Sequence, residues 1–285
     1  MLSRFAIVLL ATLPLAAQRP AGAGVNFYSL EKEAALGKQL AADYRQKVAV
    51  LESPAAQDYL DHLGQRIAAQ LPEPKWTFSF TLMAGDEGGS TREPTALPAG
   101  YVFVPAGLVL AARDEGEFAG MMAHAMAHIT ARDWTRQATR GELSQISMTV
   151  AAQAAEQNGA NRMNADSLRR SSDMQMPLMV IAMARNSHLA ADALGAKAIA
   201  QAGLNPEALV RYLDREQHDQ PGAMAASFSD LPDRDTRLAA LRTVVAGLPA
   251  SNYAAPGLAF AAFQAEVRRL AANPPAPALQ PEKEK

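Results

Sequence analysis

The sequence predicts an α+β fold that is mostly helical and carries one small sheet. Aromatic residues make up only 6% of the 285 residues and alanine is abundant, a mix that favours helices over sheet. Long stretches carry apolar residues at helical spacing, whereas the alternation typical of a strand occurs over 76–83. A chain of this length can bury a full core, so one compact domain with short tails is the simplest organisation.

Two capped helices open the predicted domain. Residues 29–48 begin with Ser29 and have glutamates in the first turn, followed by apolar positions at helical spacing. Residues 53–71 begin with Ser53 and place Pro54 in the first turn, where proline suits a helix. The segments that follow are predicted as a strand at 76–83, a loop at 85–100, a strand at 101–105, a brief helix at 106–113 and a longer helix at 114–134.

The second half of the chain is predicted to be helical almost throughout. Residues 137–201 have a helical composition that is interrupted by a polar break at 156–167. A further helix follows Asn205, which is expected to cap it, with Pro206 at the first helical position. This half therefore adds helices to the domain and no strand.

Residues 1–23 have the layout of a secretory signal peptide. Arg4 precedes an apolar run at 5–15 that is too short to span a bilayer, and small residues follow. Cleavage could occur after Gln18 or after Ala23, and an uncleaved membrane anchor is the alternative. A cleaved signal would make the protein periplasmic or secreted.

Residues 24–272 are predicted as the domain, and residues 273–285, rich in proline and charge, as a disordered tail. Lys and Arg number 27 against 29 Asp and Glu, and the positive charges are scattered, so nucleic-acid binding is not expected. Beyond the N-terminus no membrane span is expected. Cysteine is absent, which excludes a disulfide framework and any thiolate metal site.

The stretch AHAMAHITARD, residues 123–133, carries the first candidate for chemistry. His124 and His128 lie four apart on a predicted helix, so their side chains share one face about 6 Å apart and could reach one metal ion. This spacing often arises by chance, and two partly buried histidines bonded to backbone or water are the alternative. Position 125, where a zinc peptidase of the HExxH type has its general-base glutamate, is Ala125.

The surroundings of the two histidines add a longer pattern. Residues 97–137 are LPAGYVFVPAGLVLAARDEGEFAGMMAHAMAHITARDWTRQ, which gives a tight turn, a strand, a Gly-Leu helix, an acidic pair and the histidine helix in that order. This order resembles the HtpX, BepA, OMA and CAAX prenyl protease family of zinc metallopeptidases. The resemblance continues in EAALGKQLAADY, YLDHLGQRIAAQLPEPKWTFSF, AADALGAKAIAQAGLNPEALVRYLDRE and DLPDRDTRLAALR, and so covers 27–249. It implies a zincin-like metallopeptidase domain with a small sheet and an active-site helix that carries HxxxH.

The resemblance also implies a third metal ligand. The family has a glutamate four residues before an aspartate on a later helix, and the matching segment here is HLAAD, with His188 in place of the glutamate and Asp192 at the aspartate. Imidazole is itself a zinc ligand, and three imidazoles with water make a recognised four-coordinate site. The expected ligands of one zinc ion are His124, His128 and His188. Asp192 and Glu117 are candidates to orient these ligands, and ordinary surface or helix-terminal carboxylates are the alternative.

Several positions depart from the family pattern. Ala125 can neither take a proton from zinc-bound water nor pass it to the leaving amine, the two tasks of the missing glutamate. PTALP replaces the family's Asn-Ala-Phe-x-x-Pro substrate-edge motif. DLPDRDTR has Leu231 where the family has the histidine of a His-Pro loop, although Arg237 remains as a possible site residue. Because several positions have changed together, natural divergence is favoured over one deliberate change.

Three functions stay open on the sequence alone. The favoured one is an envelope pseudopeptidase that keeps the zinc site, has weak or no proteolytic activity, and binds polypeptide or misfolded envelope protein in a quality-control role. The second is an active zinc metalloendopeptidase of envelope quality control in which Asp133 or Glu117 replaces the glutamate, although Asp133 is expected to face partly away. The third is a metal-free structural or interaction protein. By the resemblance, bound polypeptide would run along an edge strand at Tyr101, Val102, Phe103 and Val104.

Overall fold

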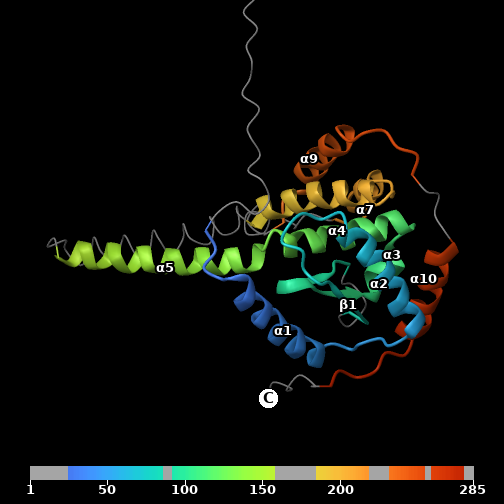
Figure 1. Cartoon of the computed structure of the whole chain (residues 1–285), viewed down its shortest axis with the longest axis horizontal. Coiled ribbons are helices and arrows are strands. Elements are labelled where there is room, and N and C mark those ends of the chain that lie inside the picture. Colours follow the sequence, from blue (N-terminus) through green and yellow to red (C-terminus); the bar gives the residue numbers. More distant parts are fainter. Residues whose placement is uncertain (1–24, 86–91, 158–183, 218–230, 254–257, 279–285) are drawn as a thin grey trace, which may run out of the picture.

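The computed structural model, drawn in Figure 1, contains one three-stranded sheet surrounded by helices, which confirms the predicted fold class. The residues it describes are 25–85, 92–157, 184–217, 231–253 and 258–278. The predicted signal peptide and the last residues of the predicted tail, 279–285, lie outside these ranges, and residues 273–278 have no regular structure. Among the described residues, no helix is long and apolar enough to cross a membrane.

The elements follow one another along the chain largely as the sequence predicts. In order they are α1 (Leu30–Lys47), α2 (Pro54–Ala68), β1 (Ser79–Met83), β2 (Thr95–Leu97), the 3-10 turn η1 (Pro98–Gly100), β3 (Tyr101–Pro105), α3 (Ala106–Ala111), α4 (Glu115–Thr130), α5 (Asp133–Gln157), a helix over 184–201, α7 (Glu207–Glu216), α9 (Arg234–Ala246) and α10 (Leu258–Ala271).

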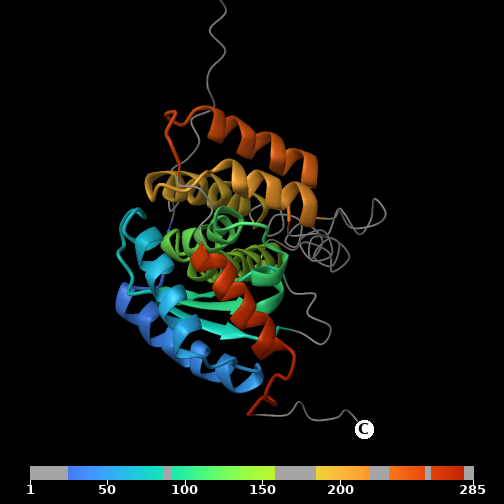
Figure 2. The same cartoon turned by 90° about the vertical axis from the view of Figure 1, so that its right-hand side faces the viewer.

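The helices lie in layers on the two faces of the sheet. Figure 2 shows α1 (blue) below the sheet, with α4 (green), α7 (gold) and α9 (orange) above it in turn. Helix α4 is apolar on nearly all sides, and its Phe118, Met121, Met122 and Met126 have no exposed surface. Complete burial of such a side chain contributes about 1.5–3 kcal/mol. The histidine helix is therefore the centre of the core, and the other layers pack around it.

Local capping explains where the first two helices begin. Ser29 accepts a hydrogen bond at Oγ from the backbone N–H of Lys32, and Ser53 accepts one from the N–H of Ala56. Such a cap contributes about 1 kcal/mol because it satisfies an N–H that the helix leaves unpaired. Both predicted caps are confirmed.

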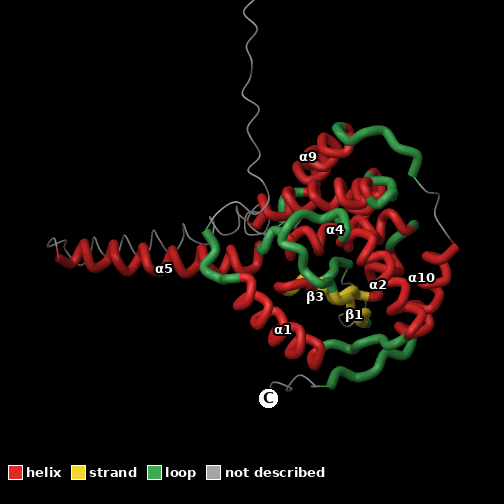
Figure 3. Tube along the Cα trace, viewed as in Figure 1, coloured by secondary structure: helices red, strands yellow, loops and turns green. Residues whose placement is uncertain are grey.

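The sheet has the order β1-β3-β2 (strands in yellow, Figure 3). Strand β1 runs parallel to β3, and β2 runs antiparallel to β3 through the tight turn at η1. The prediction of a plain loop over 85–100 is therefore wrong at Thr95–Leu97. Proline stands on both sides of these three residues, so no alternating run is long enough to reveal a strand, and pairing with β3 is what makes them one.

This order also corrects the predicted edge strand. Tyr101, Val102 and Phe103 pair with β1 on one side and with β2 on the other, and Val104 pairs with β1. The strand proposed to hold polypeptide is thus the central one, with its backbone groups already paired. The edge of the sheet next to α4 is β2.

The long helix predicted for 114–134 is in fact two helices. Helix α4 ends at Thr130 and α5 begins at Asp133, because Arg132 between them adopts a left-handed backbone with φ of +57°. From that turn α5 leads away from the body of the molecule (Figure 1). Neither glycine nor proline marks the break, so local sequence gives no sign of it.

Gly100 lies in the turn that carries the chain from η1 into β3. Gly100 has φ of +104°, and a Cβ atom added there would lie 2.4 Å from the carbonyl oxygen of Thr77. We expect Gly100→Ala to lower the free energy of unfolding by about 2–4 kcal/mol, since backbone strain and overlap act together. Urea unfolding followed by circular dichroism would measure the loss.

Gly141 in α5 is the matched control, because a Cβ added there meets no atom within 4 Å. Gly141→Ala should raise the free energy of unfolding by about 0.5–1 kcal/mol through better helix propensity. Equal losses in the two variants would contradict the strain argument.

Candidate metal centre

Three histidines from two helices meet at one point. His124 and His128 project from one face of α4, and His188 comes from the helix over 184–201. The Nε2 atoms of His124 and His128 lie 3.1 Å apart, and Nδ1 of His188 lies 3.3 Å from each of them. The structure thus brings together the three side chains that the sequence proposes as ligands, and they could hold a metal ion.

Close packing of the two helices brings His188 into this position. Gly195, seven residues after His188, lies so near α4 that an added Cβ would be 3.0 Å from the backbone nitrogen of His124. Ala191 and Ala198 on the same helix are also buried. Small residues on this face let the two backbones approach closely, so a side chain as short as imidazole can span the gap.

Carboxylates lie behind two of the three rings. Asp192 Oδ1 is 2.7 Å from Nδ1 of His124, and Asp133 Oδ2 is 2.7 Å from Nδ1 of His128. Each carboxylate favours a proton on Nδ1, which leaves the lone pair on Nε2. The two Nε2 atoms then have no proton to share across 3.1 Å, and their lone pairs repel each other unless a cation lies against both.

Burial keeps two of these rings neutral. It lowers the pKa of His124, an effect that outweighs the opposing influence of Asp192. Burial, with His124 and His128 close by, lowers the pKa of His188 to about 2. Only neutral imidazole offers a lone pair to a metal, so at neutral pH both side chains are in the form that binds one.

The spacing of the three nitrogens fits a tetrahedral metal ion. Zinc bound tetrahedrally at about 2.0–2.1 Å from imidazole nitrogens holds them about 3.3–3.4 Å apart. The observed separations of 3.1 and 3.3 Å between the ring nitrogens lie close to that value. Donor type and spacing therefore agree with a site at which three imidazoles would hold one metal ion.

Asp192 is held from its other side by Arg237, whose exposed fraction is 0%. Arg237 donates from Nε to Oδ2 at 2.6 Å and from Nη2 to Oδ1 at 2.9 Å. Burial alone would raise the pKa of the Asp192 carboxyl, but His124 and Arg237 together outweigh it and hold that pKa below its usual range. Arg237 thus anchors the carboxylate that lies against His124.

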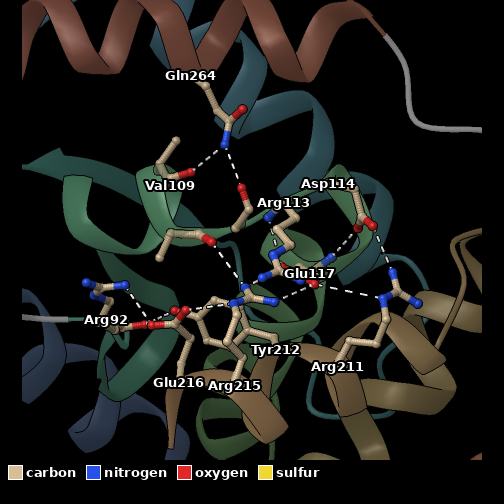
Figure 4. Close-up of polar contacts among 12 residues, drawn as sticks. Arg92, Val109, Arg113, Asp114, Glu117, Arg211, Tyr212, Arg215, Glu216 and Gln264 are labelled. Carbon is tan, nitrogen blue, oxygen red and sulfur yellow. Dashed lines mark hydrogen bonds and ion pairs between the residues drawn. The ribbon is translucent and has the colours of Figure 1, made fainter.

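Glu117 has a different role from the one proposed for it. Figure 4 shows its carboxylate at the start of α4, where it accepts hydrogen bonds from Arg215 at 3.0 and 2.7 Å and from the backbone N–H of Arg113 at 2.8 Å. These contacts join α4 to α7. Glu117 is therefore engaged away from the histidines, and the structure does not support a role in orienting a metal ligand.

The position of the missing base is enclosed by the core. Ala125 is 2% exposed and packs within the main apolar cluster. Neither acidic residue proposed as a substitute takes its place. Glu117 binds Arg215, and Asp133 lies against Nδ1 of His128, on the side of the ring away from Nε2. Asp133 thus contacts the His128 ring directly, but from the side opposite the nitrogen that faces the other two histidines.

A cavity of about 210 Å³ adjoins the histidines, between the β2–η1 hairpin and the turn from α4 to α5. Its lining includes Leu97 from the hairpin, His128 and His188 from the cluster, and Trp134 beyond the turn. Glu33 of α1 also lines it and was not among the residues predicted for the site. In sequence Glu33 is simply an acidic residue in the first turn of a helix, and nothing nearby links it to residues 99 positions later.

Comparison with known proteins agrees with this geometry. The sequence profile of Peptidase family M48 matches residues 54–245, which is more than half of the chain. The chain belongs to peptidase family M48. The match to M48 confirms the resemblance to zinc metallopeptidases at the level of the family.

Two relatives of this M48 chain have more specific names. A protein of Vibrio cholerae serotype O1, provisionally named a beta-barrel assembly-enhancing protease, is 28% identical over 194 residues, which cover 66% of this chain and 38% of that protein. The beta-barrel assembly-enhancing protease of Yersinia pestis is 22% identical over 197 residues, again 66% of this chain and 38% of that protein. The M48 chain therefore spans well under half the length of either relative.

The neutral, buried histidines predict how the metal-free protein responds to acid. In the unfolded chain a histidine takes up a proton below about pH 6.5, whereas His124 and His188 resist protonation when folded. The unfolded state then binds more protons, so stability falls as the pH drops through about 6.5 and on toward the folded-state pKa, about 2 for His188, by up to about 1.4 kcal/mol per pH unit for each histidine. Urea unfolding in the presence of a chelator would measure this slope.

Two variants assign the slope to the cluster. His188→Gln should remove a large part of it, whereas His62→Gln, at an exposed position of α2, should leave it unchanged. A slope that survives in His188→Gln would contradict the assignment.

Proposed function

We propose that this M48 chain binds zinc through His124, His128 and His188, has little or no endopeptidase activity, and binds polypeptides of the cell envelope. The observation that carries the proposal is the triangle of three ring nitrogens, 3.1–3.3 Å on a side, with a carboxylate 2.7 Å from Nδ1 of His124 and another 2.7 Å from Nδ1 of His128. In a metal-free structural protein nothing would favour this alignment of ring nitrogens, because their lone pairs repel each other.

The donor set supports zinc among the available metals. Three imidazoles suit zinc, whereas magnesium and calcium require oxygen ligands. Bound zinc would polarise a peptide carbonyl and activate water. The chain's own residues hold and orient it: Asp192 and Asp133 lie against two of the ligand rings, and Arg237 fixes Asp192.

Loss of peptidase activity follows from the proton transfer that Ala125 cannot perform. Loss of general acid–base help typically costs about two to four orders of magnitude in rate. The carboxylates of Asp133 and Glu117 are bonded to His128 and Arg215, so neither is available in its place. These contacts favour the pseudopeptidase over the active endopeptidase.

Polypeptide binding is supported by the edge of the sheet. Strand β2 pairs with β3 on one side only among the described residues, and the cavity beside His128 and His188 adjoins it. An extended peptide could add to β2 as a further strand, with alternate side chains directed toward the cavity. The proposed binding strand is therefore Thr95–Leu97 instead of Tyr101–Val104.

The envelope setting comes from two sources. Residues 1–23 predict a secretory signal, and the relatives' names refer to beta-barrel assembly. We propose that the clients are unfolded or misassembled envelope proteins in the periplasm. Because the chain spans only 38% of those relatives, their full activity is not carried over.

Metal analysis tests the zinc site. The purified protein should retain about one zinc per chain after dialysis, and His128→Ala should lose it, because one of three ligands is removed. Plasma emission spectrometry measures the content. A wild-type protein with far less than one zinc per chain would favour the metal-free alternative.

Restoring the base tests the loss of catalysis. Ala125→Glu should raise zinc-dependent cleavage of casein by about 10²–10⁴-fold, since it returns a proton acceptor next to the first ligand. Ala125→Gln is the control, with the same size and no basic carboxylate. Robust cleavage by the wild type, abolished in His128→Ala, would overturn the pseudopeptidase proposal.

A further inference from the structure

The turn between α4 and α5 has an unusual backbone for its sequence. Arg132 adopts φ of +57°, a region that non-glycine side chains seldom occupy. The next residue is Asp133, whose carboxylate lies 2.7 Å from Nδ1 of His128. The direction of the chain at Arg132 therefore decides whether Asp133 reaches the histidine.

Side-chain contacts from the start of the domain hold this turn. Arg132 donates from Nε to Oε2 of Glu33 at 2.6 Å and from Nη2 to the carbonyl oxygen of Tyr28 at 2.6 Å. Thr135, on the other side of Asp133, donates from Oγ1 to the same Glu33 oxygen at 3.0 Å. One carboxylate on α1 thus contacts residues on both sides of Asp133.

Burial strengthens these contacts. Glu33 is 1% exposed and Thr135 is 0% exposed, so the contacts are shielded from competing water. A buried charge that loses its partner is strongly disfavoured, which keeps Arg132 in place against Glu33. Arg132 in turn keeps the left-handed turn.

We propose that Glu33 and Arg132 are positioning residues for the metal centre: their ion pair fixes the left-handed turn that places Asp133 on Nδ1 of His128, and so orients His128 as a ligand. This inference rests on the proposed function, in which the histidines bind zinc. Glu33 and Arg132 act through Asp133 and do not touch the metal. Carboxylates behind a ligand histidine affect metal affinity because they fix its tautomer and orientation.

A purely structural ion pair is the competing explanation, and the molecule contains a matched example. Glu117 at the other end of α4 is also 1% exposed and pairs with Arg215 at 2.7 Å, but it contacts neither the histidines nor their carboxylates. Loss of either pair should destabilise the fold. Only loss of the Glu33 pair should change how zinc is held.

The first experiment compares Glu33→Gln with Glu117→Gln in the full chain. Zinc affinity is measured by competition with a chromophoric chelator, and ligand geometry by the visible absorption of the Co²⁺-loaded protein. We expect Glu33→Gln to weaken zinc binding about 10- to 100-fold and to alter the Co²⁺ spectrum, with wild-type values for Glu117→Gln. Wild-type affinity and spectrum in Glu33→Gln, or equal losses in both variants, would overturn the proposal.

A second comparison at Arg132 decides the question even if Glu33→Gln does not fold. Arg132→Ala and Arg132→Gly both remove the side chain, but only glycine adopts the left-handed turn without strain. If the turn positions Asp133, Arg132→Gly should bind zinc more tightly than Arg132→Ala. Equal affinities, or tighter binding by alanine, would refute a role for the turn.

The wild-type measurement separates this proposal from the one on which it rests. A wild type that binds zinc, with variants of unchanged affinity, removes only the positioning role. A wild type that binds no zinc removes both proposals.

Discussion

The packing of the helix over 184–201 against α4 is the contact on which the site depends. It exists because Gly195 and its alanine neighbours present almost no side chain to the backbone at His124. At this distance three imidazole nitrogens converge, burial keeps His124 and His188 neutral, and carboxylates lie against Nδ1 of His124 and of His128. Asp192 with Arg237 supports His124, while Asp133 supports His128. A wider separation of the two helices would leave His188 out of reach of the other two rings.

Sequence patterns predicted those structural features that are determined by residues close together in the chain. Both serine caps, the strand at β3 and the shared face of His124 and His128 follow from local spacing. The order of the strands does not, because β2 is too short to show a period and becomes a strand only through pairing with β3. The break after α4 is also hidden, since an arginine occupies a turn where glycine would be expected and is held there by Glu33, 99 residues earlier.

Under the proposed function, helix α4 separates two tasks that one HExxH helix normally combines. Holding a metal requires aligned lone pairs, and His124, His128 and their carboxylates keep that alignment. Moving a proton requires a basic group beside the first ligand, where Ala125 is enclosed by apolar neighbours. Because alanine fits a fully packed helix without cost to the core, the second task can be lost while the first is kept. A client could then be held at the edge of β2 without being cut.

Because the chain has no cysteine, it cannot form a disulfide, and a metal ion held by the histidine cluster could act as a cross-link instead. An ion bound by both His128 and His188 would close a loop between residues 60 positions apart, as a disulfide does in other proteins. Unlike a disulfide, this cross-link forms by mass action: free metal at one hundred times its dissociation constant adds about 2.7 kcal/mol to the free energy of unfolding. Under the proposed function the stability of the chain would be tied to metal supply, so that starvation for the ion would loosen the fold itself and expose it to turnover.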